Sequence, residues 1–244
     1  MKIVATIEAR MTSSRLPGKV LMPVLGKTML HYLVMRLRAS PSIDEIVLAT
    51  TINKADDPLV EFADNENLKV FRGDEDDVME RVIGAADYAD ADVVVEITGD
   101  CPIIDPEIIE QTIRMFKTNN VDYVSNGFTR SYPDGMDVQV FKLSSLKKSA
   151  SMTNDALEHE HVSLHMCRHP EIFPQINLTA PPSLHWPELG LTLDEKDDYD
   201  LLKLIIEHFD KSNPMFSCSD VIALLNNNSD WLRINENVNR KGNT

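Results

Sequence analysis

The chain has few cysteines and few basic side chains, and each shortage excludes a class of protein. Only three of its 244 residues are cysteines, with no C-x-x-C pair, so we expect reduced thiols rather than a disulfide framework. Lys and Arg number 24 against 39 Asp and Glu, and the net charge of −15 argues against general binding to nucleic acid or to an anionic membrane. No apolar run approaches the ~20 residues of a membrane-spanning helix, and the opening run is too short for a signal peptide. We therefore predict a cytoplasmic protein.

Several familiar motifs are also missing. No G-x-G-x-x-G follows the first apolar run, which argues against a dinucleotide-binding turn. Gly26–Thr28 resembles the end of a P-loop, but Leu21 stands where that motif requires glycine. His159 begins an H-E-x-x-H pattern that fails, because Ser163 occupies the place of the second histidine, and there is no G-x-S-x-G. These absences exclude the common zinc protease and serine hydrolase sites.

What the chain does have is the pattern of an α/β protein. Its length suits one domain with a full core, and 43% hydrophobic with 26% charged residues is typical of a globular chain. Short apolar runs alternate with amphipathic stretches of about 10–15 residues, which predicts a mostly parallel mixed sheet with helices on both faces. We predict strands at 3–7, 45–50, 68–71, 92–98 and 121–125, and helices at 29–38, 55–65, 76–89 and 106–118.

The pattern changes after residue 130. Residues 134–141 alternate with period two, as in an antiparallel ribbon, and a single helix is expected over 155–168. We predict one domain over 1–234 with a ribbon and helical elaboration near 130–180, and a frayed polar tail over 235–244. The remaining predicted elements are strands at 175–178 and 189–193 and helices at 144–151, 197–209 and 219–225.

The first candidate site is the loop that follows the first predicted strand. The first forty residues carry seven basic side chains and one acidic one, although the chain as a whole is acidic. Arg10, Arg15 and Lys19 lie on this loop beside hydroxyls such as Ser13, and Gly18 lets the backbone approach a ligand closely. Open α/β sheets bind ligands at the carboxyl ends of their strands, and guanidinium and ammonium groups match phosphate oxygens. We predict a phosphate site here; the alternative is a polar surface loop.

The second candidate site is a pair of carboxylates at predicted strand ends. Asp100 follows the most apolar strand, and Asp194 ends the segment Gly190–Asp194. Two carboxylates are the number that Mg²⁺ usually takes from a protein, so the pair would hold that ion if the two strands are neighbours. We expect Arg10 and Lys19 on the opposite wall of the same cleft. The alternatives are a turn at Asp100 and a helix cap at Asp194.

Five segments together resemble the cytidylyltransferases that activate acidic sugars. The segments are ARMTSSRLPGKVL, ITGDCPIIDP, YPDGMDVQVF, EHEHV and LGLTLDEKDDYD, and the resemblance spans about residues 1–210. The SpsF branch matches this pattern best, and it is related to the 3-deoxy-manno-octulosonate and acylneuraminate cytidylyltransferases. The acidic segment Gly99–Pro102 departs from the acylneuraminate enzymes.

The resemblance implies a nucleotide-diphosphosugar-transferase (GT-A-like) fold and a reaction. CMP would pass from CTP to an acidic sugar of the ulosonic type, with Mg²⁺ as cofactor and release of pyrophosphate, for a surface polysaccharide or glycan. It further implies a homodimer. The residues implied are Arg10, Lys19 and Asp100 in catalysis, Arg10, Ser13, Arg15, Gly18, Lys19 and Arg81 on the nucleotide, Asp100 and Asp194 on the metal, and Asp134, Asp137, Glu160 and His161 near the sugar.

Other interpretations stay open at this point. The stretch that contains Arg81 is rich in Asp and Glu and is also typical of a solvated helix start. The same fold serves glycosyltransferases that consume a nucleotide sugar and release a nucleotide, so the product distinguishes them from a cytidylyltransferase. A non-catalytic nucleotide-binding protein would bind CTP without turnover, and the acids at 100 and 194 argue against it.

Overall fold

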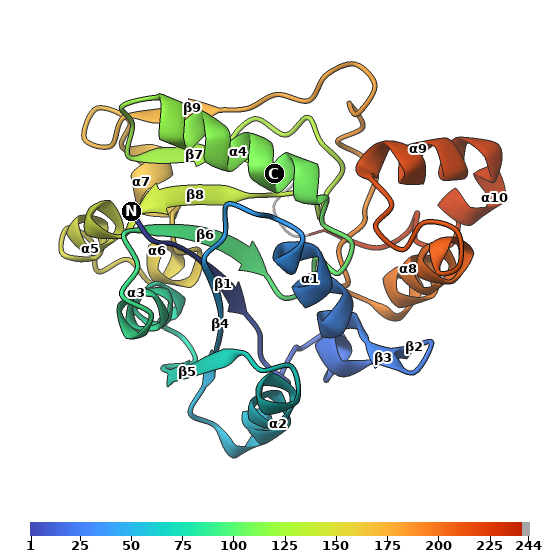
Figure 1. The fold of residues 1–244 in the computed structure, drawn as a ribbon, viewed down its shortest axis with the longest axis horizontal. Helices are drawn as coiled ribbons and strands as arrows, with labels where there is room; N and C mark the ends of the chain where they lie inside the picture. The colour runs from blue at the N-terminus through green and yellow to red at the C-terminus, as the bar shows by residue number, and fades with distance from the viewer. Residues whose placement is uncertain (241–244) are drawn as a thin grey trace.

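The structure is a computed structural model that describes residues 1–240, and a seven-stranded sheet forms its centre (Figure 1). The strand order is β5-β4-β1-β6-β8-β7-β9, and a separate small hairpin pairs β2 with β3. The strands are β1 Ile3–Glu8, β2 Pro23–Val24, β3 Lys27–Thr28, β4 Glu45–Thr51, β5 Lys69–Gly73, β6 Val93–Thr98, β7 Tyr123–Ser125, β8 Gln139–Lys142 and β9 Gln175–Asn177.

Ten α-helices and two short 3-10 helices are described within residues 1–240. The α-helices are α1 Met29–Arg38, α2 Asp57–Asn65, α3 Val78–Tyr88, α4 Pro106–Thr118, α5 Leu143–Ala150, α6 Ala156–Glu160, α7 Leu164–Arg168, α8 Lys196–Phe209, α9 Cys218–Asn227 and α10 Ser229–Leu232; the 3-10 helices are η1 Lys19–Leu21 and η2 Lys54–Asp56. Within that part of the chain, no helix is both long and apolar enough to cross a membrane.

The predicted mixed, mostly parallel sheet is confirmed. β5, β4, β1 and β6 run parallel to one another, β8 is antiparallel to both β6 and β7, and β9 is parallel to β7. β1 and β6 are apolar along most of their length because they lie at the centre of the sheet, where both faces are covered. The antiparallel strand predicted within 134–141 is shorter than expected, since only Gln139–Lys142 pairs as a strand.

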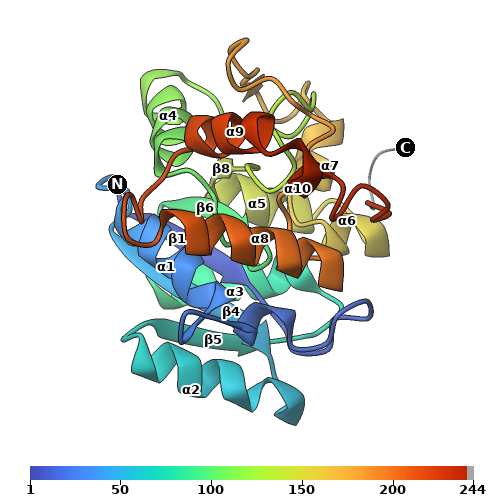
Figure 2. The ribbon, with the colours of Figure 1, turned by 90° about the vertical axis from the view of Figure 1, so that its right-hand side faces the viewer.

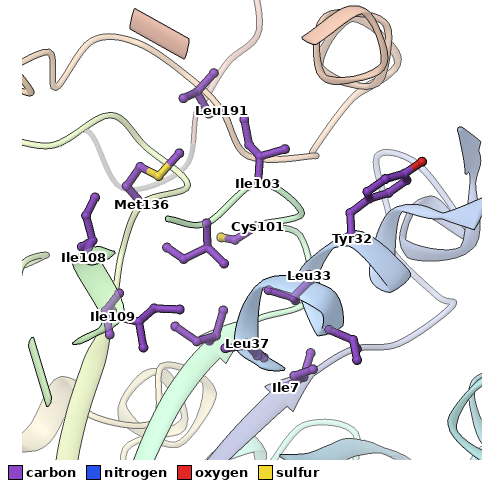
Figure 3. Packing of buried hydrophobic residues seen from close by; sticks show 14 of the residues in the cluster. Ile7, Tyr32, Leu33, Leu37, Cys101, Ile103, Ile108, Ile109, Met136 and Leu191 are labelled. Atoms are coloured by element: carbon purple, nitrogen blue, oxygen red, sulfur yellow. The ribbon is translucent and has the colours of Figure 1, made fainter. Parts of the chain in front are cut away.

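Helices cover both faces of the sheet, as predicted. Alternate residues of β1 point to opposite sides, so that Ile7 joins a core with α1, α4, α8 and α9, while Val4 packs on the opposite face beneath α3. Figure 1 shows α3 and α5 on one side of the sheet and α1 and α8 on the other. Figure 3 shows that the first core extends toward the strand ends, where Cys101, Ile103 and Met136 come together.

Two predicted elements differ in the structure. The helix expected over 155–168 is divided into α6 and α7, because Val162 adopts a left-handed conformation with φ of 41° and breaks the helical hydrogen bonding. The strand expected over 189–193 is reduced to a single parallel bridge between Asp134 and Gly190. The helix was expected to be continuous because amphipathic spacing does not reveal a break at one residue. The strand was expected because its residues are apolar, but burial of an apolar run does not require it to pair as a full strand.

The tail predicted to fray is ordered as far as Arg240. Asn235 is only 7% exposed and donates hydrogen bonds to the carbonyl of Gly190 and to Asp198. Arg240 pairs with Asp198 at 2.8 Å. A polar segment of this kind is held by hydrogen bonds and ion pairs rather than by apolar burial, so hydropathy alone missed it. Residues 241–244 of the predicted tail lie outside the described residues.

The parallel strands bring their carboxyl ends to one edge of the sheet. The loops after β1, β4, β5 and β6 all start there. The N–H of Gly99, just past β6, donates to the carbonyl of Glu8 at the end of β1 over 2.9 Å. The N–H of Leu193 donates to the carbonyl of Asp100 over 2.8 Å, which brings the late segment 190–194 to the same edge.

Candidate active site

The centre of the candidate site is the ammonium group of Lys19, which lies between two carboxylates. Its Nζ atom is 2.8 Å from Oδ2 of Asp100 and 2.9 Å from Oδ1 of Asp194. The two carboxylates proposed as metal ligands from the sequence are therefore neighbours. Asp194 does not cap the following helix, because the N-cap of α8 is Glu195, in a capping box with Asp198.

The local backbone explains why Lys19 reaches this point. Gly18 has a φ of 71°, a left-handed conformation that glycine adopts without strain, and its N–H donates to the carbonyl of Met11 at 2.9 Å. The buried carboxylate of Asp56 accepts the N–H of Met11 at 2.6 Å and also the hydroxyl of Thr51. These contacts close the loop after β1 and begin η1 at Lys19, which is 9% exposed.

The charges at this point stabilise one another. Burial works to raise the pKa of Asp100, but the attraction and hydrogen bond of Lys19 outweigh it and leave that pKa below its usual value. Burial works in the opposite sense on Lys19, and Asp100 together with Asp194 raises its pKa above the ordinary value. Asp100 and Lys19 are therefore both charged in the protein at neutral pH.

Arg15 extends the same cluster on the solvent side. One arm of its guanidinium, Nη2, lies 2.7 Å from Oδ1 of Asp194, and the other, Nη1, donates to the carbonyl of Asn239 at 3.0 Å. The expectation of basic side chains on the opposite wall from the carboxylates is wrong for Lys19, which lies between them. Sequence spacing cannot show that the partly buried carboxylates pair with the cations of the first loop.

The donor set at this point fits a Mg²⁺ ion. Oxygens of Asp100 and Asp194 both lie within 2.9 Å of one atom, so they converge on a single position, and carboxylate oxygen is the ligand that Mg²⁺ prefers. Within residues 1–240 no cluster of three or more His, Cys, Asp or Glu side chains is arranged to hold a metal alone. Two carboxylates with phosphate and water completing the shell is the usual arrangement for this ion.

Arg10 lies apart from the Lys19 cluster. Its Nη1 is 3.2 Å from Oε1 of Glu75, which also accepts the hydroxyl of Thr12 at 2.8 Å, while Oε2 of Glu75 accepts from Asn53 at 2.6 Å. The loop after β1 is thereby joined to the loop after β5. Half-buried Ser13 lies on the same loop between the two groups of contacts.

Arg81 is placed beneath the loop after β5 rather than at its surface. The residue is 4% exposed, and its guanidinium donates to the backbone carbonyls of Asp74 and Glu75. The carboxylate of Asp74 in turn accepts two backbone N–H groups of the same turn. A guanidinium occupied in this way shapes the loop, and the predicted direct contact with a nucleotide stays a prediction that these contacts do not favour.

Two of the four residues predicted near the sugar are grouped around Arg130. Its Nη1 lies 3.0 Å from Oδ1 of Asp134 and 3.8 Å from Oδ2 of Asp137. Burial, reinforced by the nearby negative charges of Asp134 and Asp100, raises the pKa of Asp137 to about 6, with the attraction of Arg130 working in the opposite sense. The parallel bridge between Asp134 and Gly190 brings this group next to the segment that ends at Asp194.

The other two lie elsewhere on the surface. Glu160 ends α6, and His161 caps it; both are exposed. The neighbouring His159 anchors this turn by pairing with Asp77 at the start of α3, at 2.8 Å. No hydrogen bond or ion pair described for residues 1–240 connects Glu160 or His161 with Asp134 or Asp137.

Several residues at the site were missed in the sequence. A cavity of about 740 Å³ beside Asp134 is lined by Arg130, Trp186 and Arg240. None of these three belongs to a recognised motif, and Arg240 lies in a segment without hydrophobic periodicity. Arg130 lies two residues before the Y-P-D-G-M-D motif and Trp186 lies three residues before the segment that begins at Leu189, so proximity to a motif could have indicated these two but not Arg240.

Comparison with known proteins gives the same family as the motifs. Residues 4–215 match the family described as Cytidylyltransferase. The spore coat polysaccharide biosynthesis protein SpsF of Bacillus subtilis is 33% identical over 235 residues, 93% of this chain and 95% of that protein. The 3-deoxy-manno-octulosonate cytidylyltransferase of Syntrophotalea carbinolica is 34% identical over 113 residues, 46% of this chain and 44% of that one.

The fold has a close counterpart among solved structures. A cytidylyltransferase from Leptospira borgpetersenii has a TM-score of 0.90 and 32% identity, and the match covers 98% of this chain and 99% of that one. The predicted nucleotidyltransferase fold is thereby confirmed. Since the family match spans most of the sequence, and a relative along nearly the full length is SpsF, the chain belongs to the cytidylyltransferase family, in its SpsF-like branch.

Proposed function

We propose that this protein transfers CMP from CTP to an acidic sugar of the ulosonic type and releases pyrophosphate, in the synthesis of a surface polysaccharide or glycan. The observation that carries the proposal is the position of Lys19 between Asp100 and Asp194 at the carboxyl edge of the sheet, with Arg15 beside it. Cations and paired carboxylates at one point are what a triphosphate and a divalent ion require. The similarity to 3-deoxy-manno-octulosonate cytidylyltransferase supports the transfer of CMP, and the similarity to a spore coat polysaccharide biosynthesis protein supports a role in polysaccharide synthesis.

The cationic side chains of the first loop bind the triphosphate in this proposal. Lys19 and Arg15 exchange their present carboxylate partners for phosphate oxygens, while Gly18 keeps the backbone close to the ligand. Arg10 and Ser13 bind toward the nucleoside side, where Glu75 now holds the Arg10 guanidinium. Arg81 acts indirectly by holding the shape of the loop after β5.

The reaction itself is a direct displacement at the α-phosphorus. The anomeric hydroxyl oxygen of the sugar forms a bond to that phosphorus, and the hydroxyl proton passes to solvent water. The bond from the α-phosphorus to the oxygen that bridges to the β-phosphate breaks, and its pair of electrons leaves with pyrophosphate. Asp100 and Asp194 would hold Mg²⁺, which when bound neutralises phosphate charge and favours ionisation of the attacking hydroxyl. Lys19 and Arg15 then stabilise the charge that develops on the leaving group, which is positioning and electrostatics rather than covalent chemistry.

The acceptor sugar lies on the side of Asp134 and Asp137 in this proposal. The two carboxylates can accept hydrogen bonds from the hydroxyl groups of a sugar, and the adjoining cavity of about 740 Å³ gives room for it. Glu160 and His161, at the end of α6, would also contact the sugar in this proposal. We also propose a homodimer and a cytoplasmic location; the unpaired thiols of Cys101, Cys167 and Cys218 support a reducing compartment.

A pyrophosphate-release screen tests the function. The purified protein is given each of the four nucleoside triphosphates with Mg²⁺ and a panel of 2-keto-3-deoxy sugar acids, and the product is identified by mass. Release that requires both CTP and a sugar acid, with a CMP-sugar as product, supports the proposal. A glycosyltransferase would instead release a nucleotide from a nucleotide sugar, and a binding protein would bind CTP without turnover.

A further inference from the structure

The C-terminal segment Asn235–Arg240 joins the two parts of the proposed site. It leaves α10 and passes along the segment 190–194 toward the loop that carries Arg15. Figure 2 shows the chain after α10 on the same side of the molecule as the blue loop that follows β1. The side chains of Asn235 and Arg240 are both buried, so the segment is packed against the domain.

The segment holds the backbone of Asp194 through a buried carboxylate. Oδ1 of Asp198 accepts from Nδ2 of Asn235 and from Nη2 of Arg240, both at 2.8 Å. Oδ2 of the same carboxylate accepts the backbone N–H of Asp194 at 3.1 Å and that of Glu195 at 2.9 Å. Asp198 is fully buried, so its charge needs the Arg240 guanidinium as compensation.

The segment also holds the side chain of Asp194, through Arg15. The carbonyl of Asn239 accepts one arm of the Arg15 guanidinium at 3.0 Å, and the other arm lies 2.7 Å from Oδ1 of Asp194. Backbone and side chain of this one residue are thus both fixed from residues 235–240. Two separate routes, through Asp198 and through Arg15, therefore lead from this segment to Asp194.

The guanidinium of Arg240 occupies the space that a side chain at position 190 would fill. A Cβ atom at Gly190 would lie 1.8 Å from Cζ of Arg240, so the guanidinium rests directly on the backbone there. Nη1 of Arg240 also donates to the hydroxyl of Thr192 at 2.8 Å. A Gly190→Ala substitution would therefore displace the flexible end of Arg240 without removing any charged group.

From this arrangement we propose that Asn235 and Arg240 are positioning residues of the catalytic site: through Asp198 and Arg15 they hold Asp194 where it meets Asp100 and Lys19. The inference rests on the proposed function, in which Asp194 is a ligand of the divalent ion. Residues that orient a metal ligand typically change ion affinity or activity by about 10–100-fold when they are removed. Arg240 does not contact the ion in this proposal. It does line the cavity proposed for the sugar, and its Nη1 lies 3.9 Å from Oδ2 of Asp134, so the positioning of Asp194 is read from ion binding measured without sugar.

Two assays on four variants test the positioning. Pyrophosphate release is measured as a function of Mg²⁺ and CTP, and binding of Mn²⁺ in the presence of CTP is followed by loss of the free-ion paramagnetic resonance signal. The variants are Arg240→Gln, Arg240→Lys, Gly190→Ala and, as the matched control, Arg233→Gln, whose side chain is exposed on the same C-terminal part of the chain. Thermal unfolding identifies any variant that does not fold.

We expect Arg240→Gln and Gly190→Ala to weaken Mn²⁺ binding about tenfold and to lower kcat by about 10–100-fold, with KM for CTP changed less than about threefold. Arg240→Lys should recover part of the loss, and Arg233→Gln should match the wild type. Wild-type ion affinity and kcat in folded Arg240→Gln would overturn the inference, as would absence of Mn²⁺ binding by the wild type with CTP. If the wild type binds the ion but no sugar acid reacts, the proposed function fails, and the ion affinities of the variants still decide the positioning.

Discussion

Replacing Lys19 by methionine tests the electrostatic arrangement of the site most sharply. Methionine keeps most of the unbranched side chain, ending one atom short of the Nζ position, and removes the charge that lies 2.8 Å from Asp100 and 2.9 Å from Asp194. Two partly buried carboxylates would then face each other without a cation from Lys19. Removing one partner of a fully buried ion pair costs roughly 3–5 kcal/mol, and partial exposure of these groups reduces the expected loss of unfolding free energy to about 2 kcal/mol.

The same variant separates a metal site from a structural ion pair. If the two carboxylates bind Mg²⁺, the ion can take the place that the ammonium leaves, so Mg²⁺ should stabilise Lys19→Met more than the wild type. Urea unfolding at neutral pH, with and without millimolar Mg²⁺, measures both effects, with Lys27→Met in the exposed β3 as control. Equal stability of Lys19→Met and wild type without Mg²⁺, or equal stabilisation of both by Mg²⁺, would refute the reasoning.

Two further predictions follow from buried groups near the strand ends. Burial raises the pKa of Glu8 from 4.5 to about 8. Between these pH values the folded protein keeps a proton that the unfolded chain loses. The unfolding free energy should therefore fall as the pH rises from 4.5 to about 8, by up to ~1.4 kcal/mol per pH unit. Glu8→Gln should reduce that slope in urea unfolding at several pH values but not abolish it, because burial also raises the pKa of Glu96 and of Asp137. Glu61→Gln on the exposed face of α2 should leave the slope unchanged. Burial raises the pKa of the Cys101 thiol well above its usual range, so Cys101→Ser should retain most pyrophosphate release, and complete loss in a folded variant would contradict a purely structural role.

The sequence predicted the arrangement that the parallel topology imposes. Buried strands at 3–7 and 92–98 end in polar loops, and parallel neighbours must bring those loops to one edge, so the meeting of the Lys19 loop with Asp100 followed from local patterns alone. The pairing of Asp194 with Asp100 could be expected only on the assumption that segment 190–194 lies beside the end of β6. In the structure the N–H of Leu193 donates to the carbonyl of Asp100, so the two segments are neighbours.

What the sequence could not predict depends on partners far away in the chain. Arg81 looked available to a ligand, but its guanidinium is occupied by two backbone carbonyls. Arg240 looked like part of a frayed end, but a buried carboxylate on α8 holds it in place. In both cases a charged side chain is buried because it compensates a specific polar group, and composition or periodicity carries no signal for such a pairing.

The most direct test of the central claim is the rate of pyrophosphate release from CTP with Mg²⁺ and a reactive sugar acid, in four proteins. These are the wild type, Asp100→Asn, Asp194→Asn and the double variant. Because both carboxylates would serve one ion, each single substitution should lower the rate by at least ~100-fold and the double variant should be scarcely slower than either single one. No release by the wild type with any sugar acid, near wild-type rates in the single variants, or losses that multiply in the double variant would contradict the account.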